Sequence, residues 1–363
     1  MPELVQNKTF SIVKAIGIIL IVIGHAAIYT PIRTFVYLIN IVIFFFVAGY
    51  FFNDNYLEKP MIFFKKKLIR FYVPWVVFGV IFVLLHNTFI KFNLISIDSH
   101  TRTAFESYNF SDIIHKILDV LTFFKWKEPL LAPLWFLFGL FTGLSVFFVI
   151  SYIAKKISKD KFEIYRAILI SIFLIIGFAG GAYKWHFSII YRPFVISGLI
   201  YIGKLYSIFK NHIKLSSVIA AISFIGLCIA TVLDYQINVG GMIFGNPVLF
   251  LVISFSGCYM LLTLAHFIDK KNNRLSDILD YIGKYTFTIM VLHYVIFKIG
   301  ALIQIWVSSL PIKYLAYYPV IPIDTSYWWV LNTVIGIVVP LFLAFIFTRI
   351  KNKVNGYLVL QNI

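Results

Sequence analysis

Long runs of apolar residues alternate with short polar segments along almost the whole chain. Ten of these runs are about as long as a helix that crosses a bilayer, which takes roughly 20 mostly apolar residues. The pattern predicts an all-α polytopic membrane protein with about ten transmembrane helices. We place the spans at about residues 9–29, 35–52, 71–90, 133–153, 167–183, 190–208, 215–233, 246–268, 282–303 and 327–348.

The composition agrees with this class. Hydrophobic residues make up 61% of the 363 residues and charged residues only 13%, whereas soluble domains have about 25% charged residues. The first apolar run is too long for the core of a cleavable signal peptide, and no small-residue cleavage site follows it. We therefore expect one integral membrane domain over residues 1–363, ending in a short cytoplasmic tail at 349–363.

The formal net charge of +17 indicates membrane orientation rather than nucleic-acid binding. Of the 32 Lys and Arg residues, we assign 20 to the cytoplasmic side, among them Arg166, and ten to the outer side, among them Lys298. Half of the outer ten lie in the one long connection at about 91–132, where charge is a weak indication of orientation. Basic connections stay in the cytoplasm, and anionic lipid headgroups attract them. We expect both termini in the cytoplasm, membrane lipid as a partner and no nucleic acid.

One connection, at about 91–132, is long enough to hold structure of its own. Its segment Ser111–Phe124 has apolar residues at helical spacing, and Ser111 is a suitable N-cap. We expect an amphipathic helix here, on the outer surface of the membrane. The two cysteines, Cys228 and Cys258, lie inside apolar runs, so we interpret them as packing residues rather than as a disulfide or metal site.

The first span carries two ionisable residues, Lys14 and His25. Each costs roughly 2.5–3.5 kcal/mol at membrane depth, so the pair needs a reason. Eleven residues separate them, which is close to three helical turns and places both on one face, ~16 Å apart. His25 is either a general base or a histidine hydrogen-bonded between helices. Lys14 either pairs with a charged donor or extends to the inner headgroups.

Other polar positions allow similar pairs of interpretations. The segment Lys65–Trp75, with Lys66, Lys67 and Arg70, is either an orientation signal or a binding site for the phosphates of a donor such as coenzyme A. Trp135 either anchors the fourth span at the outer interface or stacks on a sugar ring. His293 lies in the middle of the ninth span, where a structural and a functional role are equally supported.

Together, five segments in order resemble the acyltransferase-3 family of bacterial integral membrane acyltransferases, particularly its fucose 4-O-acetylase-like branch. In the first, a basic residue, ten intervening positions and a histidine are similar to the family's hallmark, although Lys14 stands where many members have Arg. Asn40 and Val42 stand where the similar branch often has His and Pro. The segments are KAIGIILIVIGHA, IFFFVAGYFF, KKLIRFYVPW, LWFLFGLF and IGKYTFTIMVLHY.

The resemblance implies transfer of an acyl group, expected to be acetyl, from acyl-CoA to a hydroxyl of a cell-surface or lipid-linked glycan. Acyl-CoA would be a co-substrate, no other cofactor is implied, and the location would be the bacterial cytoplasmic membrane. His25 would be catalytic, as a general base or as a carrier of the acyl group. Lys14, Lys66, Lys67 and Arg70 would bind the donor, and Asn40, Trp135 and His293 would line the acceptor pocket.

A polytopic exporter or flippase of glycans or small solutes is the alternative function. Transporters of this kind usually depend on carboxylates within the membrane or on broken, repeated helices. The spans hold almost no Asp or Glu, and no internal repeat is visible. The sequence therefore favours the enzyme, and it gives no indication of the oligomeric state.

Overall fold

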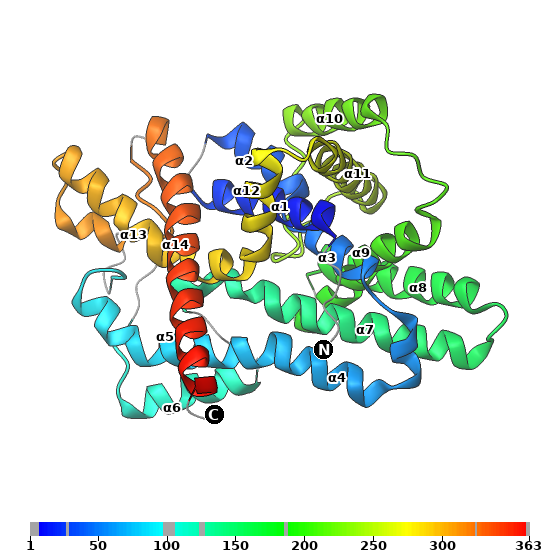
Figure 1. The fold of residues 1–363 in the computed structure, drawn as a ribbon, viewed down its shortest axis with the longest axis horizontal. Coiled ribbons are helices and arrows are strands. Elements are labelled where there is room, and N and C mark those ends of the chain that lie inside the picture. Colours follow the sequence, from blue (N-terminus) through cyan, green and yellow to red (C-terminus); the bar gives the residue numbers. More distant parts are fainter. Residues whose placement is uncertain are drawn as a thin grey trace.

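The structure, a computed structural model, describes residues 7–26, 29–96, 106–122, 128–184, 188–323 and 325–360. The regular structure of this part is helical, apart from one β-bridge between Asn238 and Ile243 (Figure 1). The helices are α1 (Lys8–His25), α2 (Thr30–Ile39), α3 (Val42–Tyr50), α4 (Pro60–Lys67), α5 (Val73–Lys91), α6 (Phe110–Thr122), α7 (Trp135–Ile157), α8 (Phe162–Ala182), α9 (Ser188–Phe209), α10 (Ser217–Val232), α11 (Pro247–Lys271), α12 (Arg274–Lys284), α13 (Thr286–Val307) and α14 (Thr325–Leu360). Short 3₁₀ segments precede α4, α7 and α14, and a π-helical segment joins α4 to α5.

Eight helical segments of the described chain are long and apolar enough to cross a membrane, which confirms the all-α membrane class. Two further predicted spans fall outside this set. α9 has 22 residues but carries Arg192 and Lys204, and α10 has only 16 residues. A helix of that length reaches ~24 Å, less than the ~30 Å of a typical hydrocarbon core. The membrane crossings of α9 and α10 stay predictions.

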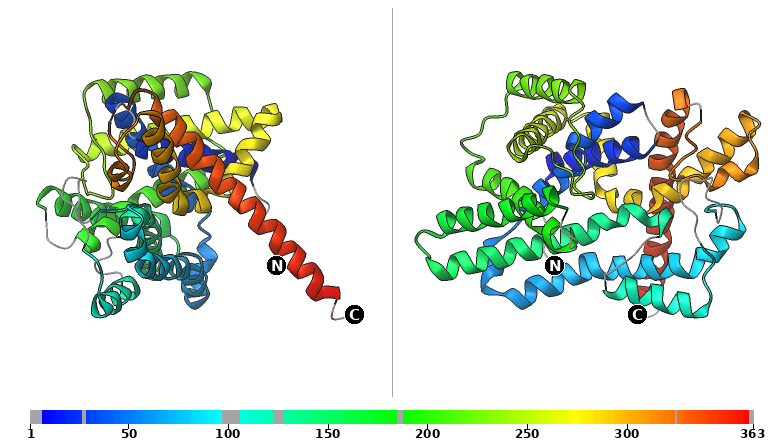
Figure 2. Two further views of the ribbon diagram at one scale, coloured as in Figure 1. Left: turned by 90° about the vertical axis from the view of Figure 1, so that its left-hand side faces the viewer. Right: turned by 180° about the vertical axis from the view of Figure 1, so that it is seen from behind.

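α1 packs mainly against α12 and α11, and more briefly against α2 and α14. α7, α8 and α9 form one neighbouring layer, which runs alongside α4 and α5 in Figure 1, and α13 pairs with α14. The end of α14 projects away from the rest of the protein in the left view of Figure 2. This arrangement leaves the His25 end of α1 facing α2, α13 and the segment before α7.

Some predicted spans are broken, contrary to their reading as continuous helices. The second span divides into α2 and α3 at Asn40 and Ile41, both of which keep helical backbone angles, so the break is a kink. The ninth divides at Tyr285 into α12 and α13. Just before this second break, α12 lies directly against the backbone of α1, because a Cβ on Gly283 would overlap the carbonyl oxygen of Ser11.

α3 and α9 also cross at very short range. A Cβ at Gly49 would overlap the carbonyl oxygen of Ile200, and one at Gly203 would overlap that of Phe46. Only glycine permits such an approach of two backbones.

The connection 91–132 contains α6, which begins one residue before the predicted start. Its N-cap is not Ser111, as expected from the sequence, but Asn109. The backbone N–H of Asp112 donates to Oδ1 of Asn109 (2.9 Å), and the backbone N–H of Asn109 donates to Oδ2 of Asp112 (2.9 Å). These reciprocal bonds satisfy two backbone donors that Ser111 leaves open. Residues 123 and 124 lie outside the described residues, and the outer position of α6 stays a prediction.

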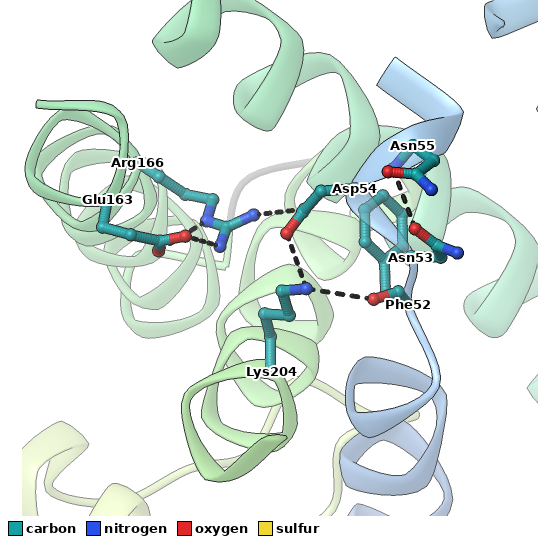
Figure 3. Close-up of polar contacts among 7 residues, drawn as sticks. All are labelled: Phe52, Asn53, Asp54, Asn55, Glu163, Arg166 and Lys204. Atoms are coloured by element: carbon teal, nitrogen blue, oxygen red, sulfur yellow. Dashed lines mark hydrogen bonds and ion pairs between the residues drawn. The ribbon is translucent and has the colours of Figure 1, made fainter. Parts of the chain in front are cut away.

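Two cations that the sequence placed in loops are buried instead. Arg166 is fully buried at the start of α8, where its guanidinium binds Asp54 (2.7 Å) and Glu163, as Figure 3 shows. Lys298 is 3% exposed within α13, and its Nζ donates to the carbonyl oxygens of Leu315 (2.8 Å) and Tyr317 (2.6 Å). Arg166 and Lys298 therefore have structural roles, since a buried cation must be paired or hydrogen-bonded.

Candidate active site

A cavity of about 200 Å³ lies at the His25 end of α1. One water takes up ~30 Å³ of liquid, so the cavity has room for a ligand much larger than a water. It brings together three of the residues that the sequence singled out, namely His25, Asn40 and Trp135. The lining residues are Ile21, His25, Tyr37, Asn40, Ile41, Pro133, Trp135, Phe136, Ile237, Asn238, Val239, Gly240 and Met290.

His25 occupies the last turn of α1 and is held by an aromatic group from α13. Its Nδ1 lies 3.1 Å from the hydroxyl of Tyr294, and its ring centre lies 5.6 Å from that of His293, with the two planes 24° apart. A histidine whose Nδ1–H donates to the tyrosine oxygen keeps the lone pair of Nε2 available for a proton. The sequence did not single out Tyr294, although it follows His293 directly in the last family-like segment.

His293 lies beside this pocket without lining it, and its tautomer follows from its partner. Its Nδ1 lies 2.9 Å from the carbonyl oxygen of Ile289, which only accepts, so Nδ1 carries the hydrogen. The Nε2 of His293 is buried and has no hydrogen-bond partner among the described residues. His293 therefore supports the ring of His25 by stacking and keeps an unused acceptor next to it.

Asn40 supplies an unused amide to the pocket. The residue is 6% exposed and lies at the kink between α2 and α3. Its side chain makes no hydrogen bond with any residue that the structure describes. Burying such a group is costly unless a ligand or water satisfies it. The position of Asn40 is therefore suited to hold a hydroxyl of a bound molecule near His25.

Trp135 forms another wall of the pocket, together with a hairpin that the sequence analysis missed. The hairpin is closed by backbone bonds between Asn238 and Ile243 (2.8 and 2.9 Å). A Cβ at Gly240 would lie 3.0 Å from the indole of Trp135, so the hairpin backbone packs on this ring. The Gly240–Gly241 pair was the available signal, because a glycine pair marks a turn, but nothing in the sequence connects it to Trp135.

The donor-binding candidates gather around Lys14, in the N-terminal half of α1, which we call the Lys14 end. Lys14 is half-buried and lies within electrostatic range of Arg70, Lys284 and Asp280, and Lys284 binds Asp280 at 2.6 Å. Arg70 lies in the π-helical segment Leu68–Tyr72, a local irregularity that is frequent at functional sites. The sequence had placed Lys284 in a basic loop and had not connected it with Lys14.

Lys66 and Lys67 lie next to this group but point to different partners. The Nζ of Lys66 lies 3.5 Å from the hydroxyl of Tyr56 and over its ring. The Nζ of Lys67 lies over the rings of Phe63 and Phe71 and within electrostatic range of Arg70. Arg70 thus lies within electrostatic range of both Lys14 and Lys67, and Lys66 lies within that range of Lys67. Helix geometry sets the Lys14 end ~16 Å from the His25 end.

Comparison with known proteins identifies one family. A family model described as an acyltransferase domain, of the acyltransferase 3 type, matches residues 7–349. The match includes α1, the kinked second span, α7 and α13, which together supply His25, Asn40, Trp135 and His293. No curated protein and no solved structure matches the chain.

Proposed function

Because the chain belongs to the acyltransferase 3 family of membrane acyltransferases, we propose that it is an O-acyltransferase that uses acyl-CoA, with acetyl as its acyl group. The acceptor in this proposal is a hydroxyl of a cell-surface or lipid-linked glycan. One observation carries the proposal: His25 lies in a pocket with the unsatisfied amide of Asn40 and the indole of Trp135. A base, a hydrogen-bonding amide and an aromatic platform are the groups that acyl transfer to a sugar needs.

The donor is proposed to bind at the Lys14 end of α1. Coenzyme A carries several phosphate groups, and a guanidinium together with ammonium groups binds phosphate strongly. Arg70, Lys67 and Lys14 supply such groups in one region. The distance of ~16 Å to His25 along α1 suits a long donor whose charged part stays behind while its thioester reaches the pocket.

In the transfer step, Nε2 of His25 takes the proton of the acceptor hydroxyl as its oxygen attacks the thioester carbonyl. The new ester C–O bond forms, the C–S bond breaks, and the thiolate of coenzyme A takes the proton back from His25. Tyr294 orients the imidazole through Nδ1, as the third group of such sites does. Asn40 positions the sugar and Trp135 offers it a flat apolar face. The same geometry allows His25 to carry the acyl group transiently.

The cellular setting follows from the expected topology. With both termini in the cytoplasm, the Lys14 end of α1 faces the cytoplasm, where acyl-CoA is made, and the His25 pocket faces the outer side. The proposed location is the cytoplasmic membrane of a bacterium, with the glycan acceptor on the outer face. Placing donor and acceptor at opposite ends of one helix lets a cytoplasmic donor modify an external glycan.

The test uses the purified full-length protein in lipid nanodiscs with radiolabelled acetyl-CoA and a glycan extract from the host. The wild type is expected to transfer label to the glycan, and His25→Ala to lose transfer by about 100-fold or more, the usual contribution of a general base. His266→Ala is the matched control, because His266 is an exposed histidine in another span, α11. Equal transfer by His25→Ala and wild type would contradict the proposal.

A further inference from the structure

An arginine next to the pocket lacks an anionic partner. Arg192 lies in the first turns of α9, half-buried, with its guanidinium carbon 5.6 Å from the ring centre of Trp135. Its Nε is buried and has no hydrogen-bond acceptor among the described residues, and Arg192 forms no ion pair within that part of the chain. Among the described residues, the guanidinium of Arg192 lies over an indole ring and contacts no carboxylate.

Stacking on Trp135 compensates only part of the cost of this position. A cation over an aromatic ring gains roughly 0.5–2 kcal/mol, and a partly desolvated charge without a counter-ion costs more than that. Two other cations buried in the structure are satisfied: Lys204 binds Asp54 at 2.6 Å, and Lys298 donates to two carbonyl oxygens. Arg192 has no such acceptor among the described residues.

The polar groups around Trp135 include several hydrogen-bond donors that have no partner in the described part of the structure. The Oδ1 of Asn238 accepts the amide of Gly241 (2.8 Å), which leaves the NH₂ of Asn238 free at the exposed edge of the hairpin. The indole N–H of Trp135 has no acceptor among the described residues. No Asp or Glu is among the described residues that line the pocket. Such a donor-rich, carboxylate-free edge favours an anionic ligand.

We propose that Arg192, with Trp135 and Asn238, forms a subsite for an oxyanion on the acceptor glycan. The sugar ring lies on Trp135, and a carboxylate or phosphate group of the same acceptor binds the guanidinium, which matches two oxygens at once. The acceptor is then an acidic sugar or a sugar joined to a phosphate. This inference rests on the proposed function, because it assigns the ligand of the same pocket.

Saturation-transfer NMR on the protein in nanodiscs tests the subsite without any donor. The probes are D-glucuronic acid, D-glucose 1-phosphate and, as the neutral reference, D-glucose. We expect at least one anionic sugar to bind about 10-fold more tightly than glucose, the gain from one charge-assisted contact. A preference for the glucuronate indicates a carboxylate-bearing sugar, and a preference for the phosphate indicates a phosphate-linked one.

Arg192→Gln should abolish this preference, and Arg192→Lys should keep part of it, since it retains the charge but not the planar fork. Lys184→Gln is the matched control, because it removes an exposed cation from the predicted outer connection that leads into α9. Thermal unfolding of each variant checks that the fold is kept. The subsite is contradicted if the wild type shows no preference over glucose, with or without binding, or if Arg192→Gln keeps the preference. Neither result affects acyl transfer by His25, which the labelled-donor assay measures separately.

Discussion

Two arginines in the neighbouring helices α8 and α9 show how this protein uses buried charge. Arg166 is fully buried and paired with two carboxylates, one of which, Asp54, also binds Lys204 (Figure 3). Arg192 is half-buried beside the pocket and faces an indole ring instead. The first cluster is complete without a ligand, whereas the second is not. The comparison shows that His293, Asn40 and Arg192, which lie in or beside the pocket, keep polar atoms without a partner among the described residues.

Removal of Arg166 should have the largest effect on stability. Arg166→Gln leaves Asp54 and Glu163 without their common cation inside the α8–α9 layer. Breaking a buried pair costs roughly 3–5 kcal/mol, and we expect about 3 kcal/mol because the two carboxylates are 32% and 46% exposed. The measurement is thermal unfolding in nanodiscs, where the midpoint should fall clearly.

Arg192→Gln is compared with Arg166→Gln in the same unfolding experiment. Because it removes a charge that has no counter-ion, its unfolding midpoint should stay at that of the wild type or rise. If Arg192→Gln is as destabilising as Arg166→Gln, then Arg192 has a structural role and the contrast between the two arginines is wrong.

Substitutions of Lys14 test the proposed binding of the donor. Lys14→Ala should weaken the use of acetyl-CoA by about 10- to 100-fold, which corresponds to the roughly 1.5–3 kcal/mol of a hydrogen bond to a charged group. Lys14→Arg should be tolerated, because arginine keeps the charge and binds phosphate well. Steady-state kinetics should assign the loss mainly to the KM for acetyl-CoA. Full activity of Lys14→Ala would show that Lys14 has no role with the donor.

Tyr294 tests whether the pocket depends on a positioned histidine. Tyr294→Phe removes the hydroxyl that lies 3.1 Å from Nδ1 of His25 and keeps the ring. We expect kcat to fall about 10-fold, the loss of roughly one hydrogen bond, with little change in either KM. The matched control is Tyr259→Phe. The hydroxyl of Tyr259 donates to the carbonyl oxygen of Lys214 and accepts from the backbone N–H of Ser216, and neither residue lines the pocket. A wild-type kcat for Tyr294→Phe would remove the positioning role.

Much of this architecture could be predicted from the sequence because a bilayer imposes simple rules. Every backbone group in lipid must be bonded internally, so each long apolar run becomes a helix. The Lys14–His25 stripe follows from helical periodicity alone, and in the structure both residues lie in α1, with His25 in its last turn and Lys14 in its N-terminal half. His25, Asn40 and Trp135 come together in one pocket, and their roles remain proposals.

The remaining features depend on contacts between distant segments, which periodicity does not describe. The kink at Asn40 could not be predicted from the sequence. Asn40 keeps helical backbone angles, so the kink does not interrupt the apolar pattern of a helix. Lys298 looked like a loop cation because its carbonyl partners lie 17 and 19 residues further along. The subsite at Arg192 needs α7, α9 and the Asn238 hairpin to meet at one place, and only the folded chain brings them there.

The most direct test of the central claim, that the His25 pocket carries out glycan acylation, is mass spectrometry of the host's surface glycan. Wild type, His25→Ala and His266→Ala would be expressed at matched levels in a deletion strain. The account predicts ester-linked acyl groups with the wild type and His266→Ala, and their loss with His25→Ala. Equal acylation with His25→Ala would show that this histidine is structural. A glycan whose acylation does not depend on the protein would contradict the enzyme and favour an exporter or flippase.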